Sequence, residues 1–419
     1  MHKGLSIPQA VLIFADEAAA WKVAGLPQID RIELALNDFF RRSGMREPVP
    51  VIVRGITAPA SRANIRLTSD LESLGTSEVL VLSTRIVLDR NSLVRAFESF
   101  PAQNNFPALI VDASEIRADS GAAVLKQLRV TEREAVASAG DAGERDWGYL
   151  AQKDDVARCA RQLFRRTTKP QDGVVSRFLN RPLSRSLSQL LVRFPLLPNQ
   201  LTILLMALPV AGAILLLRGD YFGFALGAIL FHLHSALDGC DGEIARVKYL
   251  ESESGRKLDA LCDRFSTLLL AISLGFGLSR QPGNIDALRW IYTAEGVGAA
   301  LFIGIAETLL TRTRIEDDVA AGRDRYGSYL TNHRQSFNQG DQLKLWMIKH
   351  TGMLSLGQGA TSFFGEMTKR DVFNFAFMLL AVCGLASWVL HILALCACVI
   401  LVLALKETLT PTLDANSAA

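Results

Sequence analysis

The chain has 419 residues, of which 49% are hydrophobic and 21% are charged, and its formal net charge at pH 7 is +3. This hydrophobic content excludes a disordered chain, and the small net charge gives no reason to expect nucleic acid as a partner. The average hides a division: residues 1–195 are rich in charge, whereas residues 198–408 hold nearly all the long apolar runs. We therefore expect a soluble part followed by a membrane part.

The cysteines and the first residues add two expectations. None of the six cysteines belongs to a CxxC pair, and most lie in apolar segments, so we expect small core or lipid-facing residues, not disulfides or metal ligands. The first twenty residues contain Asp16 and Glu17 and lack a long apolar core, which argues against a signal peptide. The N-terminal half is therefore expected to stay in the cytoplasm.

Residues 1–150 have the pattern of an α/β domain. Apolar residues recur at helical spacing over 29–43, and a polar helix is predicted over 154–166. Short apolar runs predict strands at 9–15, 49–53, 79–82 and 108–111. Strands that alternate with helices indicate a mostly parallel sheet.

Residues 172–194 predict an amphipathic helix, in which apolar residues alternate with Arg177, Arg181, Arg185 and Arg193. A basic helix with an apolar face suits a membrane interface, although a surface helix packed on the soluble domain would show the same pattern. Because an apolar segment follows directly, we favour the interface, and we assign residues 151–194 to a linker and this helix.

The remaining part, residues 195–410, is predicted to be an all-α membrane domain. Six segments approach the ~20 apolar residues that a bilayer requires. They lie at about 198–217, 221–246, 257–279, 287–310, 371–388 and 390–407. The last two are separated only by a short turn near 387–391, so one kinked hydrophobic block also fits.

The distribution of Lys and Arg predicts the orientation of these segments. The loop 311–370 carries nine Lys and Arg residues, whereas the connections near 218–220 and 280–289 carry few. The positive-inside rule therefore places the basic loop and both termini in the cytoplasm, on an inner or plasma membrane.

Two pairs of aspartates stand at the adjacent ends of the second and third segments. Asp238 and Asp241 are three residues apart, and Asp259 and Asp263 are four apart, so each pair shares a helix face. Ionisable groups at membrane depth usually face a cavity, a partner or a metal. Carboxylates without His or thiolate partners suit Mg²⁺, Mn²⁺ or Ca²⁺. Helix-end carboxylates in solvent would explain one pair, but not both at this spacing.

The residues around the aspartates fit a nucleotide diphosphate. Gly242 and Ala245 are small enough for a ligand to approach the backbone, and Arg246 can pair with phosphate through two hydrogen bonds. Gly255 would permit the turn between the two helices. Metal ions held by the carboxylates could clamp the diphosphate.

This pattern, Asp-x2-Asp-Gly-x2-Ala-Arg-x8-Gly-x3-Asp-x3-Asp, resembles the signature of the CDP-alcohol phosphotransferase family at every position, and the resemblance extends over about residues 172–408. It implies transfer of a substituted phosphate from a CDP-alcohol to an alcohol, with release of CMP, by a homodimer.

The same resemblance assigns roles to residues. Two metal ions, Mg²⁺ or Mn²⁺, would be held by Asp238, Asp241, Asp259 and Asp263. Asp263 would also be the general base on the acceptor hydroxyl. The CDP part would be contacted by Asp238, Gly242, Ala245, Arg246 and Gly255.

The stretch from Lys169 to Arg185, with Pro198-Asn199-Gln200 after it, is similar to the branch of di-myo-inositol phosphate phosphate synthases. Their acceptor is a phosphorylated inositol, which implies a second anion site, although a lipid acceptor stays open. The candidates here are Arg177, Arg181, Arg185, Lys369 and Arg370. The arginines could equally anchor the chain on lipid headgroups.

Residues 1–150 resemble the sugar-phosphate nucleotidyltransferase fold, which that branch also carries. Backbone N–H groups of a glycine-rich loop cradle phosphates in such enzymes, but this chain has Asp16 and Glu17 there and no glycine. Arg85 stands near the place of a metal-binding aspartate. We therefore expect a degenerate domain that serves structure, regulation or dimer contacts. Asp112, directly after the fourth predicted strand, is the one feature that supports the alternative of a bifunctional enzyme that also makes its CDP donor.

An alternative of another class is a cation transporter that uses the acidic cluster. It predicts carboxylates spread across the membrane depth, whereas these lie at one border. His232 and His234 are two residues apart on a predicted helix and face different sides, so we expect packing or hydrogen-bonding roles. Glu295 and Glu307 in the fourth segment receive no assignment.

Overall fold

A computed structural model of the chain describes residues 8–43, 45, 47–55, 64–68, 78–94, 106–118, 122–138, 147–167, 173–320 and 370–409, with the backbone alone for 117–118, 311–320, 370, 407 and 409. The chain divides into two compact units. The first comprises Met1–Thr168, Ser188–Pro195 and Glu243–Leu250, and the second Lys169–Leu187, Leu196–Gly242 and Glu251–Ala419.

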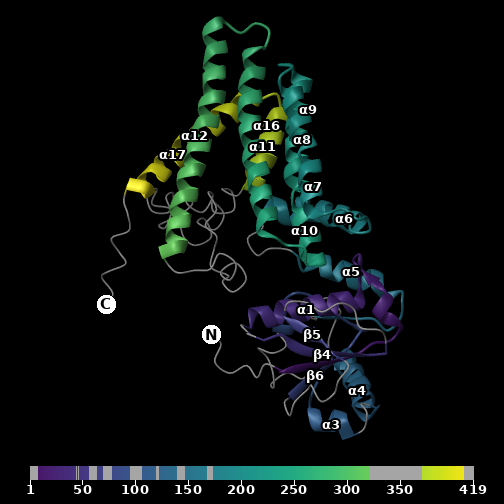
Figure 1. Cartoon of the computed structure of the whole chain (residues 1–419). Coiled ribbons are helices and arrows are strands. Elements are labelled where there is room, and N and C mark those ends of the chain that lie inside the picture. The colour runs from purple at the N-terminus through teal and green to yellow at the C-terminus, as the bar shows by residue number, and fades with distance from the viewer. Residues whose placement is uncertain are drawn as a thin grey trace, which may run out of the picture. The chain divides into compact units, whose positions relative to one another are not determined.

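The first unit is built on a five-stranded sheet in the order β5-β4-β1-β6-β8 (Figure 1). Its strands are β1 (Ala10–Phe14), β4 (Val49–Arg54), β5 (Ile65–Leu67), β6 (Glu78–Ser83) and β8 (Leu109–Asp112). β1 pairs in parallel with β4 and β6, β4 pairs in parallel with β5, and β8 is antiparallel to β6. The four predicted strands and the mostly parallel sheet are thus confirmed.

Both faces of this sheet are covered, because successive residues of a strand point to opposite faces. Val11 and Ile13 of β1 join the apolar cluster of α1 (Gln28–Arg42), whereas Leu12 joins the cluster of α3 (Ala113–Ala118) and α4 (Ala122–Ser138). The smaller elements of the unit are η1 (Glu17–Ala20), β2 (Lys22–Val23), β3 (Leu26–Pro27), β7 (Ile86–Leu88), β9 (Trp147–Tyr149) and α5 (Asp155–Arg165).

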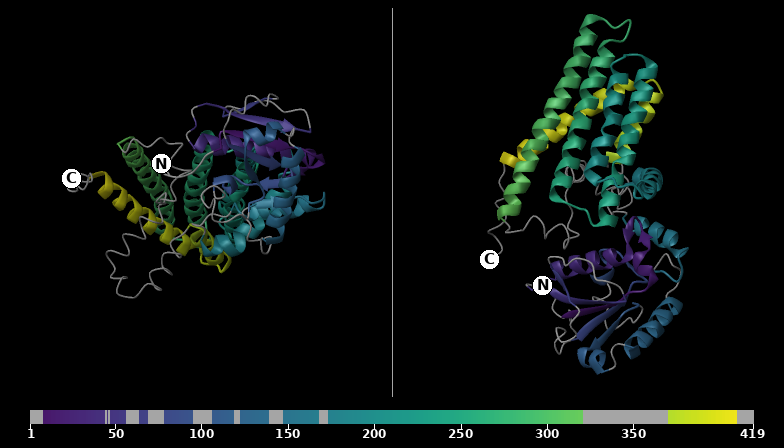
Figure 2. Two further views of the ribbon diagram at one scale, coloured as in Figure 1. Left: turned by 90° about the horizontal axis from the view of Figure 1, so that it is seen from below. Right: turned by 45° about the vertical axis from the view of Figure 1, so that its right-hand side comes forward.

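The second unit is helical. A continuous helix runs over residues 174–191, as η3 (Ser176–Asn180, a π-helix) and α6 (Arg181–Leu191) with one further turn before them. The helices that follow are α7 (Pro198–Leu205), α8 (Ala207–Leu216), α9 (Tyr221–Leu237), α10 (Gly239–Lys248), α11 (Glu253–Ser279), α12 (Asp286–Ala320), α16 (Arg370–Val382) and α17 (Ala386–Leu409). α11 packs against α12, α9 against α8 and α16, and α17 crosses α12 obliquely (Figure 2).

Five helices among the described residues are long and apolar enough to cross a membrane. They are Pro198–Leu216, Tyr221–Lys248, Glu253–Ser279, Asp286–Leu310 and Ala386–Lys406. They correspond to five of the six predicted segments. The remaining segment, predicted at 371–388, is a shorter apolar helix that ends at Val382.

The turn between the last two helices lies earlier than predicted. Residues 387–391 belong to α17, and the chain turns at Gly384, whose φ is +80°. The Leu385 N–H donates to the Leu380 carbonyl, which is the closing bond of a Schellman motif with glycine in the left-handed position. The hydrophobic pattern continues without a break through this turn, so the sequence indicates it only through Gly384. The last two predicted segments are separate helices, α16 and α17.

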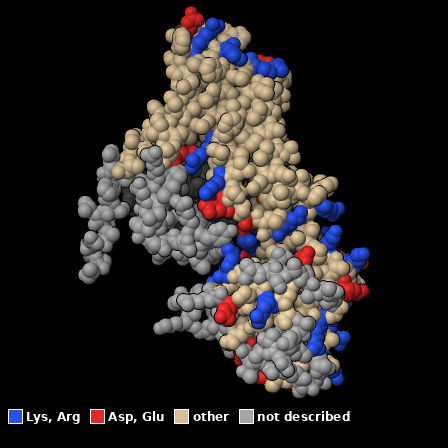
Figure 3. Space-filling model, in the orientation of Figure 1, with Lys and Arg blue, Asp and Glu red and all other residues tan. Residues whose placement is uncertain are grey.

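Much of the surface of the helical unit is apolar. Figure 3 shows a broad area with few Lys, Arg, Asp or Glu side chains. The exposed apolar residues of this unit include Ile214, Phe222, Leu395 and Val402. An exposed apolar sheath of this kind fits contact with the hydrocarbon of a bilayer.

Small residues allow α11 and α12 to approach closely. A Cβ on Gly296 would lie 2.7 Å from the Ala271 carbonyl oxygen and 2.9 Å from the Gly275 Cα atom. Close backbone contact between glycines is a common way for helices to associate in membranes, where the hydrophobic effect no longer separates helix from lipid.

We predict that Gly296→Ala lowers the stability of the chain by about 1–3 kcal/mol, because the added methyl group must push the two backbones apart. Gly298→Ala is the matched control, since a Cβ there meets nothing within 4 Å. Thermal unfolding in detergent measures both, and equal midpoints for the two variants would contradict the packing described.

Candidate active site

The four aspartates lie on consecutive helices of the second unit. Asp238 joins α9 to α10 with helical dihedral angles (φ −51°, ψ −31°), and Asp241 is in the first turn of α10. Asp259 and Asp263 lie one turn apart in α11. Each predicted pair is therefore carried by helical backbone.

Both pairs lie in the neighbourhood of Cys262. Its thiol, between Asp259 and Asp263, is close enough to all four carboxylates to interact with them electrostatically. Within the described ranges, however, no three Asp, Glu, His or Cys side chains form a ready-made metal-holding group.

Two hydrogen bonds orient the side chain of Asp241. Its side chain is buried, the Thr202 hydroxyl of α7 donates a hydrogen bond to one carboxylate oxygen, and the Gly242 N–H donates to the other. The Thr202 hydroxyl also lies 3.1 Å from the Pro198 carbonyl oxygen of its own helix. Thr202 was not predicted from the sequence, although it is a hydroxyl residue in an apolar span, two positions after Pro198-Asn199-Gln200.

The other residues of the motif have defined surroundings. Gly242 and Arg246 are four residues apart in α10 and share a helix face, and Ala245 is buried. A Cβ on Gly255 would lie 2.9 Å from the Asn199 side-chain oxygen, so Gly255 allows α11 to pack against Asn199.

The expectation that Gly255 makes the turn between the helices is wrong. Gly255 lies in the first turn of α11, where its N–H donates to the capping Ser252 hydroxyl. The turn falls earlier, at Tyr249, whose φ is +58°. Tyrosine rarely adopts this left-handed conformation, and for that reason the sequence did not indicate it.

Three of the five candidates for the acceptor phosphate lie on the 174–191 helix. Arg181 is buried, and a Cβ on Gly239 would lie 3.0 Å from its Nη1 atom, so this guanidinium is next to the aspartate motif. Arg177 is exposed and Arg185 is half-buried. Lys369 lies outside the described residues, and only the backbone of Arg370 is described.

Asp371 connects the start of α16 to the start of the 174–191 helix. Its carboxylate accepts a hydrogen bond of 2.5 Å from the Ser176 N–H, and Gly173 has no room for a Cβ beside it. A carboxylate at a helix N-terminus satisfies free N–H groups and is favoured by the helix dipole. This contact brings Arg370, the residue before Asp371, to the helix of Arg177 and Arg181.

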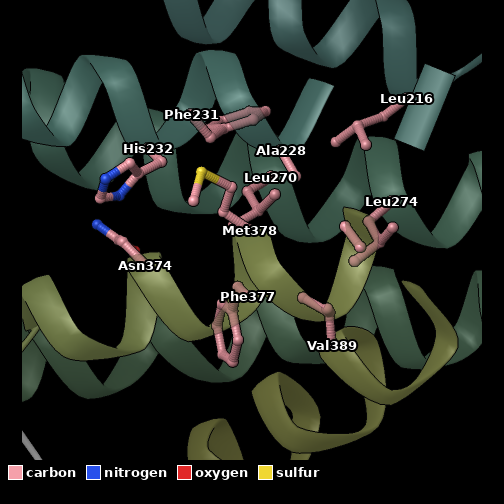
Figure 4. A pocket seen from close by; sticks show the side chains of 11 residues that line it. Leu216, Ala228, Phe231, His232, Leu270, Leu274, Asn374, Phe377, Met378 and Val389 are labelled. Atoms are coloured by element: carbon pink, nitrogen blue, oxygen red, sulfur yellow. The ribbon is translucent and has the colours of Figure 1, made fainter. Parts of the chain in front are cut away.

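The membrane histidines occupy apolar surroundings. His232 and His234 are buried, and the His232 ring packs 5.4 Å from the Phe375 ring. His232 and Asn374 line one end of a pocket whose other walls are mainly apolar side chains, including Phe231, Leu274 and Phe377 (Figure 4). For His232 the expectation of a packing role fits this arrangement.

The two glutamates of the fourth segment are paired within the helical unit. Glu307 forms an ion pair of 2.9 Å with Arg264, the residue after Asp263, and this pair links α11 to α12. Glu295 lies 2.8 Å from Nδ1 of His391 on α17. Both carboxylates therefore have structural partners.

In the first unit, an ion pair joins the residues that follow β1 and β6. Asp16 accepts hydrogen bonds from Arg85 (2.6 Å), Arg129 (3.1 Å) and Thr84 (3.0 Å). Partial burial acts to raise the pKa of Asp16, but the hydrogen bonds from Arg85 and from the Ala18 N–H outweigh it and hold the pKa below its usual value. Asp112, after β8, caps α3 through the N–H and hydroxyl of Ser114.

Comparison with known proteins finds the family of the helical unit. Residues 195–400 match the CDP-alcohol phosphatidyltransferase family. A protein of Aquifex aeolicus named bifunctional IPC transferase and DIPP synthase is 35% identical over 150 residues, which are 35% of this chain and 33% of that protein.

Two further relatives are similar over shorter segments. A protein of the same name from Archaeoglobus fulgidus is 36% identical over 128 residues, 30% of this chain and 25% of its own length. A phosphatidylinositol phosphate synthase of Corynebacterium glutamicum is 35% identical over 79 residues, 19% of this chain and 35% of its own length. The chain thus spans about a third or less of the length of the curated relatives it matches.

The resemblance drawn from the aspartate motif and from the stretch before the first span is confirmed by these matches. The matched range also contains the motif and the helices that carry it. Residues 195–400 of this chain belong to the CDP-alcohol phosphatidyltransferase family.

Proposed function

We propose that the chain is a phosphotransferase that moves a substituted phosphate from a CDP-alcohol donor to an alcohol acceptor and releases CMP. The observation that carries the proposal is the placement of Asp238, Asp241, Asp259 and Asp263 on α10, α11 and the junction before α10, all within electrostatic range of Cys262 and inside the residues that match the family. The names of the relatives agree with this class of reaction.

The donor set of this site fits a hard divalent cation. Four carboxylates at close range repel one another, and oxygen ligands are those that Mg²⁺ and Mn²⁺ prefer. Asp238, Asp241, Asp259 and Asp263 would hold two such ions. Bound there, the metal would neutralise charge on the diphosphate and on the attacking and leaving oxygens.

The protein's own residues would orient the reactants. The hydrogen bond from Thr202 fixes the carboxylate plane of Asp241. Gly242 and Ala245 leave the backbone of α10 open to the CDP part, Arg246 pairs with its phosphates, and Asp238 and Gly255 complete the CDP contacts. Asp263 takes the proton from the acceptor hydroxyl as it attacks the donor phosphorus in line.

For the acceptor we propose a phosphorylated alcohol such as inositol phosphate, with a lipid as the alternative. Arg181 is buried against Gly239, and Asp371 holds the start of α16 at the same helix, which supports Arg177, Arg181, Arg185 and Arg370 as candidates for the anion site. Lys369 is proposed from the sequence alone. Anchoring on lipid headgroups explains the exposed Arg177 equally well.

We propose six spans, with α16 as the sixth, and a membrane-surface position for the 174–191 helix. Phe178, Leu179, Leu183 and Leu190 on that helix are exposed, as an interfacial helix requires. The Lys and Arg content of the 311–370 loop favours both termini and the active site in the cytoplasm, on an inner or plasma membrane. The family resemblance favours a homodimer.

A cation transporter is disfavoured by the partners of the remaining acidic residues. Glu295 contacts His391, and Glu307 forms an ion pair with Arg264. The aspartates of the motif lie in the N-terminal parts of α10 and α11 and at the junction before α10. A permeation path needs ionisable groups at successive depths.

We predict that Asp263→Asn lowers the rate of CMP release by about 100-fold or more, the usual loss when a general base is removed. The assay uses the purified chain in detergent with Mg²⁺, inositol phosphate, and CDP-inositol, CDP-glycerol or CDP-diacylglycerol as donor. Mass spectrometry of the products then identifies the donor that reacts.

Asp286→Asn is the control for this substitution, because the Asp286 side chain is 92% exposed at the start of α12. Full turnover by Asp263→Asn would remove the proposed base, whereas loss of activity in both variants would indicate a general effect of the change.

We predict that Thr202→Val weakens Mn²⁺ binding by about 10–100-fold, as is typical when the partner of a metal-binding carboxylate is lost. Thr202→Ser keeps the hydroxyl and should restore the affinity. The matched control is Thr293→Val, since Thr293 donates only to the Arg289 carbonyl of its own helix. Titration of Mn²⁺ by electron paramagnetic resonance measures all three, and a Thr202→Val curve like that of the parent would refute the role of Thr202.

We predict that the full chain releases no pyrophosphate from CTP in the presence of Mg²⁺ and a sugar phosphate. The Asp16–Arg85 pair occupies the strand ends where the phosphates would bind, and Asp16 would repel them. Heat-denatured chain sets the background. Release above that level would establish the bifunctional alternative, which the names of the relatives keep open.

A further inference from the structure

The first unit contains the carboxyl ends of two helices that begin in the second. Residues Ser188–Pro195 continue the 174–191 helix, and Glu243–Leu250 include the last turns of α10. Val192 and Val247 are buried in one apolar cluster with Val23, Ala24 and Phe164 of the N-terminal part. The end of α10 is therefore part of the core of the first unit.

Arg31 binds the carboxyl end of α10 through a hydrogen bond. The side chain is fully buried, Nη1 donates to the Val247 carbonyl at 2.9 Å, and Nη2 donates to the Val23 carbonyl at 2.6 Å. The last carbonyls of a helix have no partner within the helix, and a cation there also interacts favourably with the helix dipole. One guanidinium thus ties the end of α10 to β2.

The residues after α10 are held as well. Tyr249 packs against the apolar cluster of α1, and the Arg90 guanidinium lies 5.4 Å from its ring centre. Lys248 Nζ donates to the Phe194 carbonyl at 3.3 Å. A non-glycine residue at φ +58° is strained, and such a conformation persists only where the surroundings determine it.

We propose that the N-terminal unit is a scaffold for the active site: it fixes the carboxyl end of α10 and thereby positions Asp241 and Arg246, which the same helix carries. Arg31 and Val247 are positioning residues in this scheme. This role would explain why the domain is retained although its phosphate loop has been replaced by an ion pair. The link to catalysis rests on the proposed function, whereas the anchoring of α10 does not.

The test measures hydrogen–deuterium exchange of the α10 backbone in the full chain in detergent. Val247→Ala removes two methyl groups from the cluster that holds the helix end. Val79→Ala removes the same two groups from β6, where Val79 is fully buried in the cluster on the α3 and α4 side. Both variants weaken the first unit, but only the first touches the anchor.

We expect Val247→Ala to raise the exchange of the α10 amides about tenfold, a factor that corresponds to about 1.4 kcal/mol, and Val79→Ala to leave it unchanged. Alanine favours the helix more than valine does, so a purely local effect of the substitution would have the opposite sign. Arg31→Lys, which keeps the charge but loses the two-pronged donor, should act like Val247→Ala without altering α10 itself.

Unchanged α10 exchange in both Val247→Ala and Arg31→Lys overturns the scaffold, as does an equal rise in Val79→Ala. Because exchange needs neither donor nor acceptor, this outcome is distinct from a failure of the proposed transferase, which the CMP assay alone decides.

Discussion

The mutual repulsion of four carboxylates at the ends of two largely apolar helices is the constraint on which the helical unit depends. Placing a charged carboxylate near a bilayer is unfavourable in free energy, and repulsion between four neighbouring carboxylates adds to this unfavourable term. The surrounding contacts hold the helix ends in place against that repulsion. Thr202 fixes Asp241, the Ser252 cap starts α11, and Arg181 lies against Gly239 between the 174–191 helix and the motif.

The regular elements could be predicted because their signal is local. The four strands and the first helix follow from short apolar runs and a helical repeat, and five spans follow from length and composition. The two errors concern turns. Gly384 was overlooked because the apolar pattern continues through it, and Gly255 was assigned a turn that Tyr249 makes, since the sequence does not indicate a strained tyrosine.

The residues of the candidate site likewise differ in whether their placement could be predicted from local sequence. That each aspartate pair lies on helical backbone was predicted from the spacing, because residues three and four apart share a helix face. Thr202, Asp371 and Arg31 were not identified as partners, because each acts on a residue far away in sequence: Asp241, Ser176 and Val247, respectively. Only the packing of the elements brings such pairs together, and no periodicity in one segment reports it.

The N-terminal unit combines a sheet covered on both faces with a cluster of paired charges at its strand ends. Its sheet is covered on both faces by apolar clusters. At the strand ends, Asp16 and Arg85 form an ion pair, whereas a nucleotide phosphate would need positive charge that is not already neutralised. Because the two charges largely cancel, they produce only a weak electrostatic field that could attract a phosphate. The face that carries Arg31 and Val23 is, in contrast, buried against the end of α10. Within this unit, Arg31 thus caps the end of α10, the helix that carries Asp241, Gly242, Ala245 and Arg246 of the motif.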